Sequence, residues 1–69
     1  MGDKSVCETV LTKSNDAGEI TLPKGNRTDD EMTAIGRGYM VLFASNSDVD
    51  HFQLTEKGKR ILDYYHDHT

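Results

Sequence analysis

The chain has little of what usually stabilises a small protein. Its 69 residues include a single cysteine, so no disulfide can form within the chain. Tryptophan is absent, aromatic residues make up 7% and hydrophobic residues 35%, which predicts a thin core. One domain spanning residues 1–69 is expected, and a domain of this size buries only about 60% of its unfolded surface. These shortages favour dimerisation or another protein partner.

Long apolar runs and leader-like segments are also lacking. No run approaches the roughly 18 apolar residues that a membrane-spanning helix needs. The first ten residues, MGDKSVCETV, show no basic region followed by an apolar one, so we expect no secretory signal. The expected setting is cytoplasmic and away from membranes.

Basic residues are outnumbered, with eight Lys and Arg against twelve Asp and Glu. This balance disfavours a general nucleic-acid binder, because phosphate contacts need clustered cations. The cations gather in two small groups, Lys24 with Arg27, and Lys57 with Lys59 and Arg60. The acids concentrate at Asp29, Asp30 and Glu31, and at Asp48 and Asp50. The two basic groups are candidate contact points on an acidic body.

The first half of the chain predicts a short strand and a short helix. Residues 5–13 combine helical spacing with β-branched side chains, so helix and strand both stay open there. Residues 19–23, EITLP, alternate apolar and polar and stop at proline, which predicts a strand. Thr28 and Glu31 form a capping-box pattern that predicts a helix start, and two glycines end this helix after two to three turns.

The second half predicts a hairpin and a closing helix. The most apolar run, YMVLFA at 39–44, is expected to be a central strand, and residues 51–54 are expected to return beside it. Thr55 is a plausible N-cap for a final helix that reaches about His66. The expected fold is therefore a small α+β domain: a short N-terminal strand, a short helix, a β-hairpin and a C-terminal helix.

A glycine interrupts the apolar stripe of the closing helix. The stripe has the spacing i, i+4, i+7, i+8, i+11 and consists of Leu54, Gly58, Ile61, Leu62 and Tyr65. Glycine within a helix costs about 1 kcal/mol relative to alanine. We therefore expect another backbone to approach Gly58 closely. The residues expected to be most buried are Phe43, Phe52, Leu54, Ile61, Leu62 and Tyr65.

The stretch GYMVLFASNSDVDHFQLTEKGKRIL resembles the second half of a winged helix-turn-helix domain. The resemblance covers about residues 28–65 and includes a Leu-Thr-x-x-Gly signature at Leu54, Thr55 and Gly58. It implies a DNA-associated transcription regulator. It also implies phosphate contacts near the short helix and flanking the wing, made by Lys24, Arg27, Arg37, Lys57 and Arg60. Two departures are that residues 1–37 barely hold the usual three helices and that the short helix opens with three acids.

The N-terminal half has a second, weaker resemblance. VLTKSNDAGEITLPKGNR resembles the AbrB-type swapped-hairpin DNA-binding domain, and the matching positions are Gly18, Ile20, Leu22, Pro23 and Arg27. That resemblance implies an obligate dimer.

No residue set supports catalysis, a cofactor or a metal ion. Cys7 has no signature that links it to a histidine, so it is expected to be a small buried residue. The histidines at 66 and 68 do not share a helix face. We therefore expect no enzyme, and the winged-helix resemblance implies a small regulator associated with double-stranded DNA. The alternative is an acidic adaptor or inhibitor that occupies a basic partner, such as a nucleic-acid-binding protein.

Overall fold

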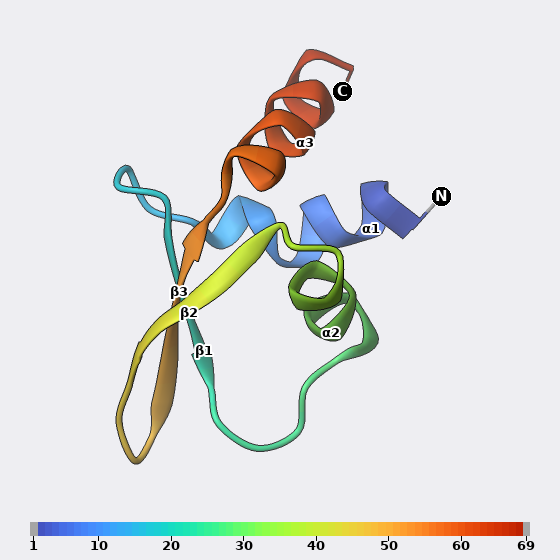
Figure 1. Cartoon of the computed structure of the whole chain (residues 1–69). Helices are drawn as coiled ribbons and strands as arrows, with labels where there is room; N and C mark the ends of the chain where they lie inside the picture. Colours follow the sequence, from blue (N-terminus) through green and yellow to red (C-terminus); the bar gives the residue numbers. More distant parts are fainter. Residues whose placement is uncertain (1, 69) are drawn as a thin grey trace.

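Helices and strands alternate along the chain in the computed structural model, which describes residues 2–68. In order, they are α1 (Gly2–Thr9), the short 3-10 helix η1 (Leu11–Lys13), β1 (Glu19–Pro23), α2 (Asp29–Gly36), β2 (Met40–Ser45), β3 (Val49–Leu54) and α3 (Glu56–Asp67) (Figure 1). The predicted α+β class is confirmed, as is the order of short strand, short helix, hairpin and closing helix.

The three strands form one antiparallel sheet in the order β1-β3-β2. Alternate residues of each strand face the helices, as the two-residue period of a strand requires. The buried apolar residues on this inner face are Ile20, Leu22, Met40, Phe52 and Leu54. Figure 1 shows α1 and α2 on one side of the sheet, while the tip of the β2–β3 hairpin extends away from the helices.

The ambiguous residues 5–13 are helical. Val6, Cys7, Val10 and Leu11 are all buried, and their i, i+1, i+4, i+5 spacing places them on one face of α1 and η1. This face packs into the same cluster as the inner face of the sheet. Burial of one helical stripe therefore outweighs the β-branched content, which is a weak local preference. Cys7 is buried here, as expected.

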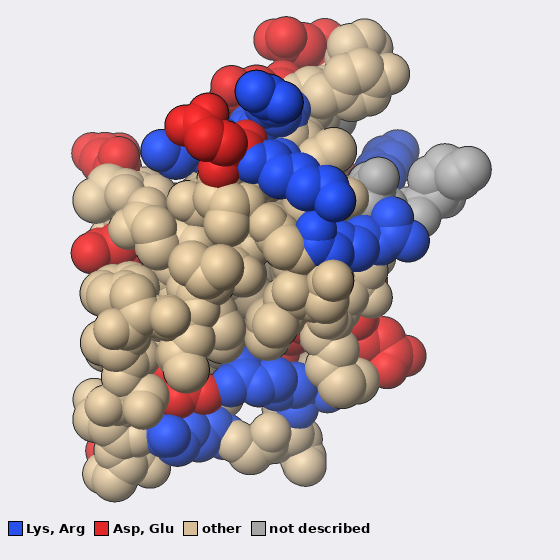
Figure 2. Space-filling view, in the orientation of Figure 1, with Lys and Arg blue, Asp and Glu red and all other residues tan. Residues whose placement is uncertain are grey.

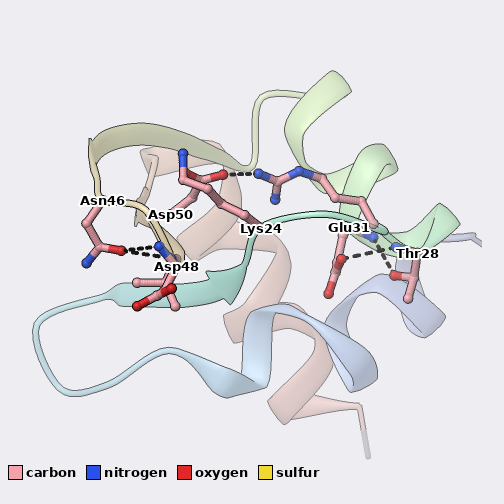
Figure 3. Close-up of polar contacts among 8 residues, drawn as sticks. Lys24, Thr28, Glu31, Asn46, Asp48 and Asp50 are labelled. Carbon is pink, nitrogen blue, oxygen red and sulfur yellow. Dashed lines mark hydrogen bonds and ion pairs between the residues drawn. The ribbon is translucent and has the colours of Figure 1, made fainter.

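The capping box predicted at the start of α2 is confirmed. The backbone N–H of Glu31 donates to the Thr28 hydroxyl, and the Glu31 carboxylate accepts from the Thr28 N–H, both at 3.1 Å (Figure 3). Asp30 accepts hydrogen bonds from the hydroxyls of Ser5 at 2.7 Å and Thr9 at 2.9 Å. Two of the three acids that open α2 therefore hold the helix in place.

The apolar run at 39–44 is a strand, but its expected central place in the sheet is wrong. β3 is the central strand, and β2 lies at an edge. The exposed fractions of the side chains are 50% for Val41, 56% for Leu42 and 52% for Phe43. β3 is central because β1 and β2 both pair with it, and its inner positions Asp50, Phe52 and Leu54 are all buried.

The expected burial of Phe43 is also wrong, and a β-bulge gives the reason. The pairing of β2 with β3 shifts between Leu42 and Ala44, so Phe43 is the extra residue of the bulge. Its ring lies 6.1 Å from the ring of His51, centroid to centroid. His51 belongs to the outer positions of β3, which face away from the helices. Phe43 is thereby removed from the core.

Gly58 sits against the start of β2. An ideal Cβ at this position would lie 2.0 Å from the carbonyl oxygen of Tyr39 and 3.1 Å from Cδ2 of Leu54. The same Tyr39 carbonyl accepts a hydrogen bond from the N–H of Thr55 at 3.0 Å. The Thr55 hydroxyl accepts from the Gly58 N–H at 3.1 Å and donates to the Gly38 carbonyl at 2.5 Å. The predicted close backbone approach is confirmed.

The rest of the predicted core divides into two classes. Phe52 and Leu54 are buried, as expected. Ile61, Leu62 and Tyr65 pack against the core but are only partly buried, because the later turns of α3 extend beyond the body of the protein (Figure 1). No helix among residues 2–68 is long and apolar enough to cross a membrane.

Replacing Gly58 with alanine should destabilise the protein by up to about 2 kcal/mol, the difference between two opposing effects. Alanine improves helix propensity by about 1 kcal/mol. However, a methyl group 2.0 Å from a backbone oxygen forces α3 and β2 apart, and such overpacking is the larger effect. Urea unfolding at fixed protein concentration measures the difference.

Gly36→Ala is the matched control. This residue is also helical, its φ is not positive, and nothing lies within 4 Å of a Cβ built there. The substitution should leave stability unchanged or raise it by up to about 1 kcal/mol. If both variants were stabilised, the close approach at Gly58 would not constrain the fold.

Candidate nucleic-acid interface

The first predicted basic group, Lys24 with Arg27, lies on a carboxylate of the protein itself. Both residues belong to the connection between β1 and α2, and both reach Asp50 on β3. Lys24 Nζ lies 3.2 Å from Oδ1 of Asp50, and Arg27 Nη2 forms an ion pair with Oδ2. Lys24 and Asp50 lie together in Figure 3. These two ion pairs therefore hold the connection between β1 and α2 against β3.

Asp50 is buried because of its place in the strand. It precedes Phe52 and Leu54 by two and four residues, so all three side chains share the inner face of β3. The guanidinium carbon of Arg27 lies 5.2 Å from the centroid of the Phe52 ring, where a cation–π attraction adds to the ion pair. Nη1 of Arg27 is buried and has no hydrogen-bond partner among the described residues. The guanidinium is thus held mainly by Asp50 and Phe52.

The two cations set the protonation of Asp50. Burial alone would raise the pKa of this carboxyl, because it disfavours the charged form. The hydrogen bond and charge of Lys24, followed by those of Arg27, outweigh burial and bring the pKa of Asp50 below its ordinary value. Asp50 is therefore a carboxylate at neutral pH, and it neutralises much of the basic group that the sequence suggested for phosphate.

The second basic group lies at the other end of the sheet. Lys57, Lys59 and Arg60 are exposed in the first turns of α3, and Arg37 is exposed directly after α2. Lys57 Nζ lies 5.6 Å from the ring centroid of Tyr39, the residue that follows the α2 turn. This contact brings the start of α3 next to the segment that carries Arg37. We call Arg37, Lys57 and Arg60 the α3 basic surface. Lys59 lies on another flank of α3, where its Cε is 3.9 Å from the position of an ideal Cβ on Gly18.

Figure 2 shows the two basic groups apart on the visible face, with uncharged surface between them. Acidic side chains stand beside the upper basic group in the same view. Of the predicted contact residues, the structure places Lys57 and Arg60 together on α3 and separates Lys24 and Arg27 from them.

The hairpin tip carries no basic residue. The turn between β2 and β3 is Asn46-Ser47-Asp48, in which the Asn46 side-chain oxygen accepts hydrogen bonds from the N–H groups of Asp48 and Val49, both at 2.8 Å (Figure 3). The Asp48 carbonyl accepts from the Lys24 N–H at 3.0 Å. The tip is thus ordered by its own hydrogen bonds and bears an exposed acid, which is unsuited to entering a phosphate-lined groove.

The histidines have local partners. Nδ1 of His51 lies 3.1 Å from the Thr21 hydroxyl, and the His68 ring stacks on Tyr64 with 4.0 Å between centroids. Within residues 2–68 no three His, Cys, Asp or Glu side chains are grouped so that they could hold a metal ion. The expectation of a protein without metal or catalytic residues stays a prediction.

Comparison of the chain with protein-family models, with curated proteins and with solved structures found no match. The resemblances to winged helix-turn-helix and AbrB-type domains therefore remain predictions. The functional conclusions below depend on the residues of this chain.

Asp50 is the residue of this region that sequence reasoning missed. A signal was present, because an acid at the inner position of a strand, two residues before a buried phenylalanine, needs a cation to offset the cost of burying its charge. The candidate cations lie 23 and 26 residues earlier in the sequence (50 − 27 and 50 − 24), and only the antiparallel pairing of β1 with β3 brings them near. The pairing of β1 with β3 must therefore be known before the ion pairs of Asp50 can be predicted.

Asp50→Asn should destabilise the protein at neutral pH, because it leaves the buried guanidinium of Arg27 without its counter-charge. The pKa of Asp50 is lower in the native state than in the unfolded state. Its contribution to stability is therefore complete above the ordinary carboxyl pKa of about 4 and is lost as the pH falls through the lowered value. The difference between wild type and variant should thus shrink on acidification.

Unfolding curves over a series of pH values provide this measurement. Asp16→Asn, which changes an exposed acid in the turn before β1, is the control and should stay close to wild type at every pH. A second variant, Asp50→Asn with Arg27→Met, should recover part of the lost stability because the unpaired charge is gone. A constant gap between wild type and Asp50→Asn at all pH values would rule out the charge as its cause.

Proposed function

We propose that this protein is a non-enzymatic regulatory module that associates with double-stranded DNA through the α3 basic surface. The observation that carries the proposal is the gathering of Arg37, Lys57 and Arg60 where the turn after α2 meets the start of α3. In this arrangement the protein contacts the phosphate backbone.

Two properties of α3 support a phosphate contact. Its first turn is the positive end of the helix dipole, which favours anions, although the Gly58 N–H there already donates to the Thr55 hydroxyl. Lysine and arginine side chains beside such an end add charge-assisted hydrogen bonds to phosphate oxygens. The chain as a whole is acidic, with a net charge of −4 that includes this surface, so DNA is repelled elsewhere and meets this end of the molecule.

The arrangement favours positioning on the backbone over base reading. A reader of the major groove presents a helix with neutral or basic residues at its start. In α2, Asp29 is exposed at this start, while Asp30 and Glu31 are engaged within the protein. Affinity should therefore depend strongly on salt and only weakly on DNA sequence.

A second candidate function is binding to another protein. The exposed apolar residues of β2 favour it, since an apolar strand at a sheet edge is suited to protein contact. In that case the acidic surface would meet a basic partner such as a nucleic-acid-binding protein. Binding of duplex DNA at low salt, or its absence, separates the two candidate functions.

Titration of a DNA duplex at several salt concentrations tests the proposal. If the three basic residues each contact one phosphate, the logarithm of the association constant should fall with the logarithm of salt concentration with a slope of about −3. Lys57→Gln and Arg60→Gln should each weaken binding and reduce the steepness by about 0.9. The effect should be the same on duplexes of different sequence.

Lys24→Gln is the matched control, because it removes the same charge from a residue that already contacts Asp50. It should leave the affinity and the salt slope close to wild type. An equal loss from Lys24→Gln would move the contact to the first basic group. Absence of binding at low salt would exclude DNA and favour the protein partner.

A further inference from the structure

β2 presents an open, uncharged edge. It pairs with β3 on one side only, and its sequence from Met40 to Ser45 contains no charged residue, no proline and no glycine. The other edge strand, β1, contains Glu19 and Pro23, two devices that commonly block further strand pairing. Figure 2 shows uncharged surface between the two basic groups on the face where Figure 1 places β2 in front. β2 thus carries neither of these two devices, and its β-bulge at Phe43 interrupts only the part of the edge that follows Leu42.

The backbone of β2 is arranged for one more strand. Thr55 N–H donates to the Tyr39 carbonyl across the β2–β3 ladder, whereas Leu54 N–H turns to the other side and donates to the Gly18 carbonyl. The next pair, Met40 with Leu54, is therefore a non-hydrogen-bonded pair, and alternation gives the same status to Leu42 with Phe52. The N–H and carbonyl groups of Met40 and Leu42 thus point to the open edge.

We propose that this edge pairs with the β2 edge of a second copy of the chain, antiparallel and across a twofold axis. The result is a continuous six-stranded sheet. Two observations identify a second copy as the occupant: the distribution of charge along the edge and the surface that the strand exposes.

The charge pattern along the edge is self-complementary. The central part of the edge is neutral, so two copies oppose no like charges there. At the Met40 end stands Lys57, which lies over Tyr39; at the Ser45 end the turn carries exposed Asp48. Antiparallel pairing brings the Lys57 end of one copy to the Asp48 end of the other, and the twofold axis repeats this match. Lys57 thereby leaves the α3 basic surface in the dimer, whereas Arg60 is not part of this match.

The exposed apolar side chains of β2 also favour an apolar partner surface. Val41, Leu42 and Phe43 are each at least half exposed in a chain whose core is small. Pairing with an identical strand covers these side chains with side chains of the same kind on both faces of the new sheet. Domains below about 70–80 residues commonly gain stability from such association.

Sedimentation equilibrium over a range of concentrations tests the proposal. The wild type should form a dimer, and Leu42→Lys should raise its dissociation constant by about tenfold or more, since the new charge replaces a covered apolar side chain. Val41→Lys, on the opposite face of the strand, guards against a folding defect in the first variant. Tyr64→Lys is the control, because Tyr64 is the most exposed large hydrophobic residue and lies on α3. It should dimerise like wild type.

Amide hydrogen exchange shows which edge is used. The Val41 amide faces β3 and should be protected at every concentration, whereas the Leu42 amide should become protected only as the dimer forms. Asp48→Lys should weaken the dimer, and adding Lys57→Asp to it should restore association. A dimer with an unprotected Leu42 amide would overturn the proposal, because the copies would then meet elsewhere. A protein that stays monomeric at all concentrations would also overturn the proposal. The β2 edge would then pair with a different partner.

Discussion

The carbonyl group of Tyr39 is the point on which three elements meet. Its oxygen accepts the N–H of Thr55, at the end of β3, and lies where a side chain at Gly58 would stand. Tyr39 directly precedes β2, so this one group fixes the start of one strand, the end of the other and the first turn of α3. The register of the hairpin follows, because pairing continues from Met40 with Leu54. Only glycine allows the helix to come this near.

A second set of contacts, the ion pairs of Asp50, lies at the opposite end of the sheet and determines the role of the basic residues there. Asp50 is near the start of β3, and Lys24 and Arg27 tie the connection between β1 and α2 to it. One basic group is thereby used to hold the fold. The α3 basic surface is placed by the Tyr39 junction, with Lys57 over the Tyr39 ring, and it remains at the surface. The two groups look alike in the sequence, and their different roles follow from the burial of one carboxylate.

Features that depend on neighbouring residues could be predicted from the sequence. The capping box of Thr28 and Glu31 and the close approach at Gly58 both follow from local spacing and from the known cost of a glycine in a helix. The place of β2 in the sheet could not, because an apolar run looks the same whether the strand has one neighbour or two. The bulge at Phe43 and the ion pairs of Asp50 likewise depend on pairing between distant segments.

The apolar character of β2 links the two proposals. Burying a large aliphatic or aromatic side chain is worth about 1.5–3 kcal/mol, and this strand leaves three such side chains in water in a chain with a small core. If two copies meet at this edge, the twofold axis that covers the strand also duplicates Arg37 and Arg60, the members of the α3 basic surface that do not face Asp48. A duplex that reached both surfaces would gain from the high effective concentration of the second site. DNA would then stabilise the dimer as much as dimerisation strengthens DNA binding, because coupling between two equilibria is reciprocal. The few basic residues that one copy offers to phosphate would thus bind DNA more tightly in the dimer than in the monomer.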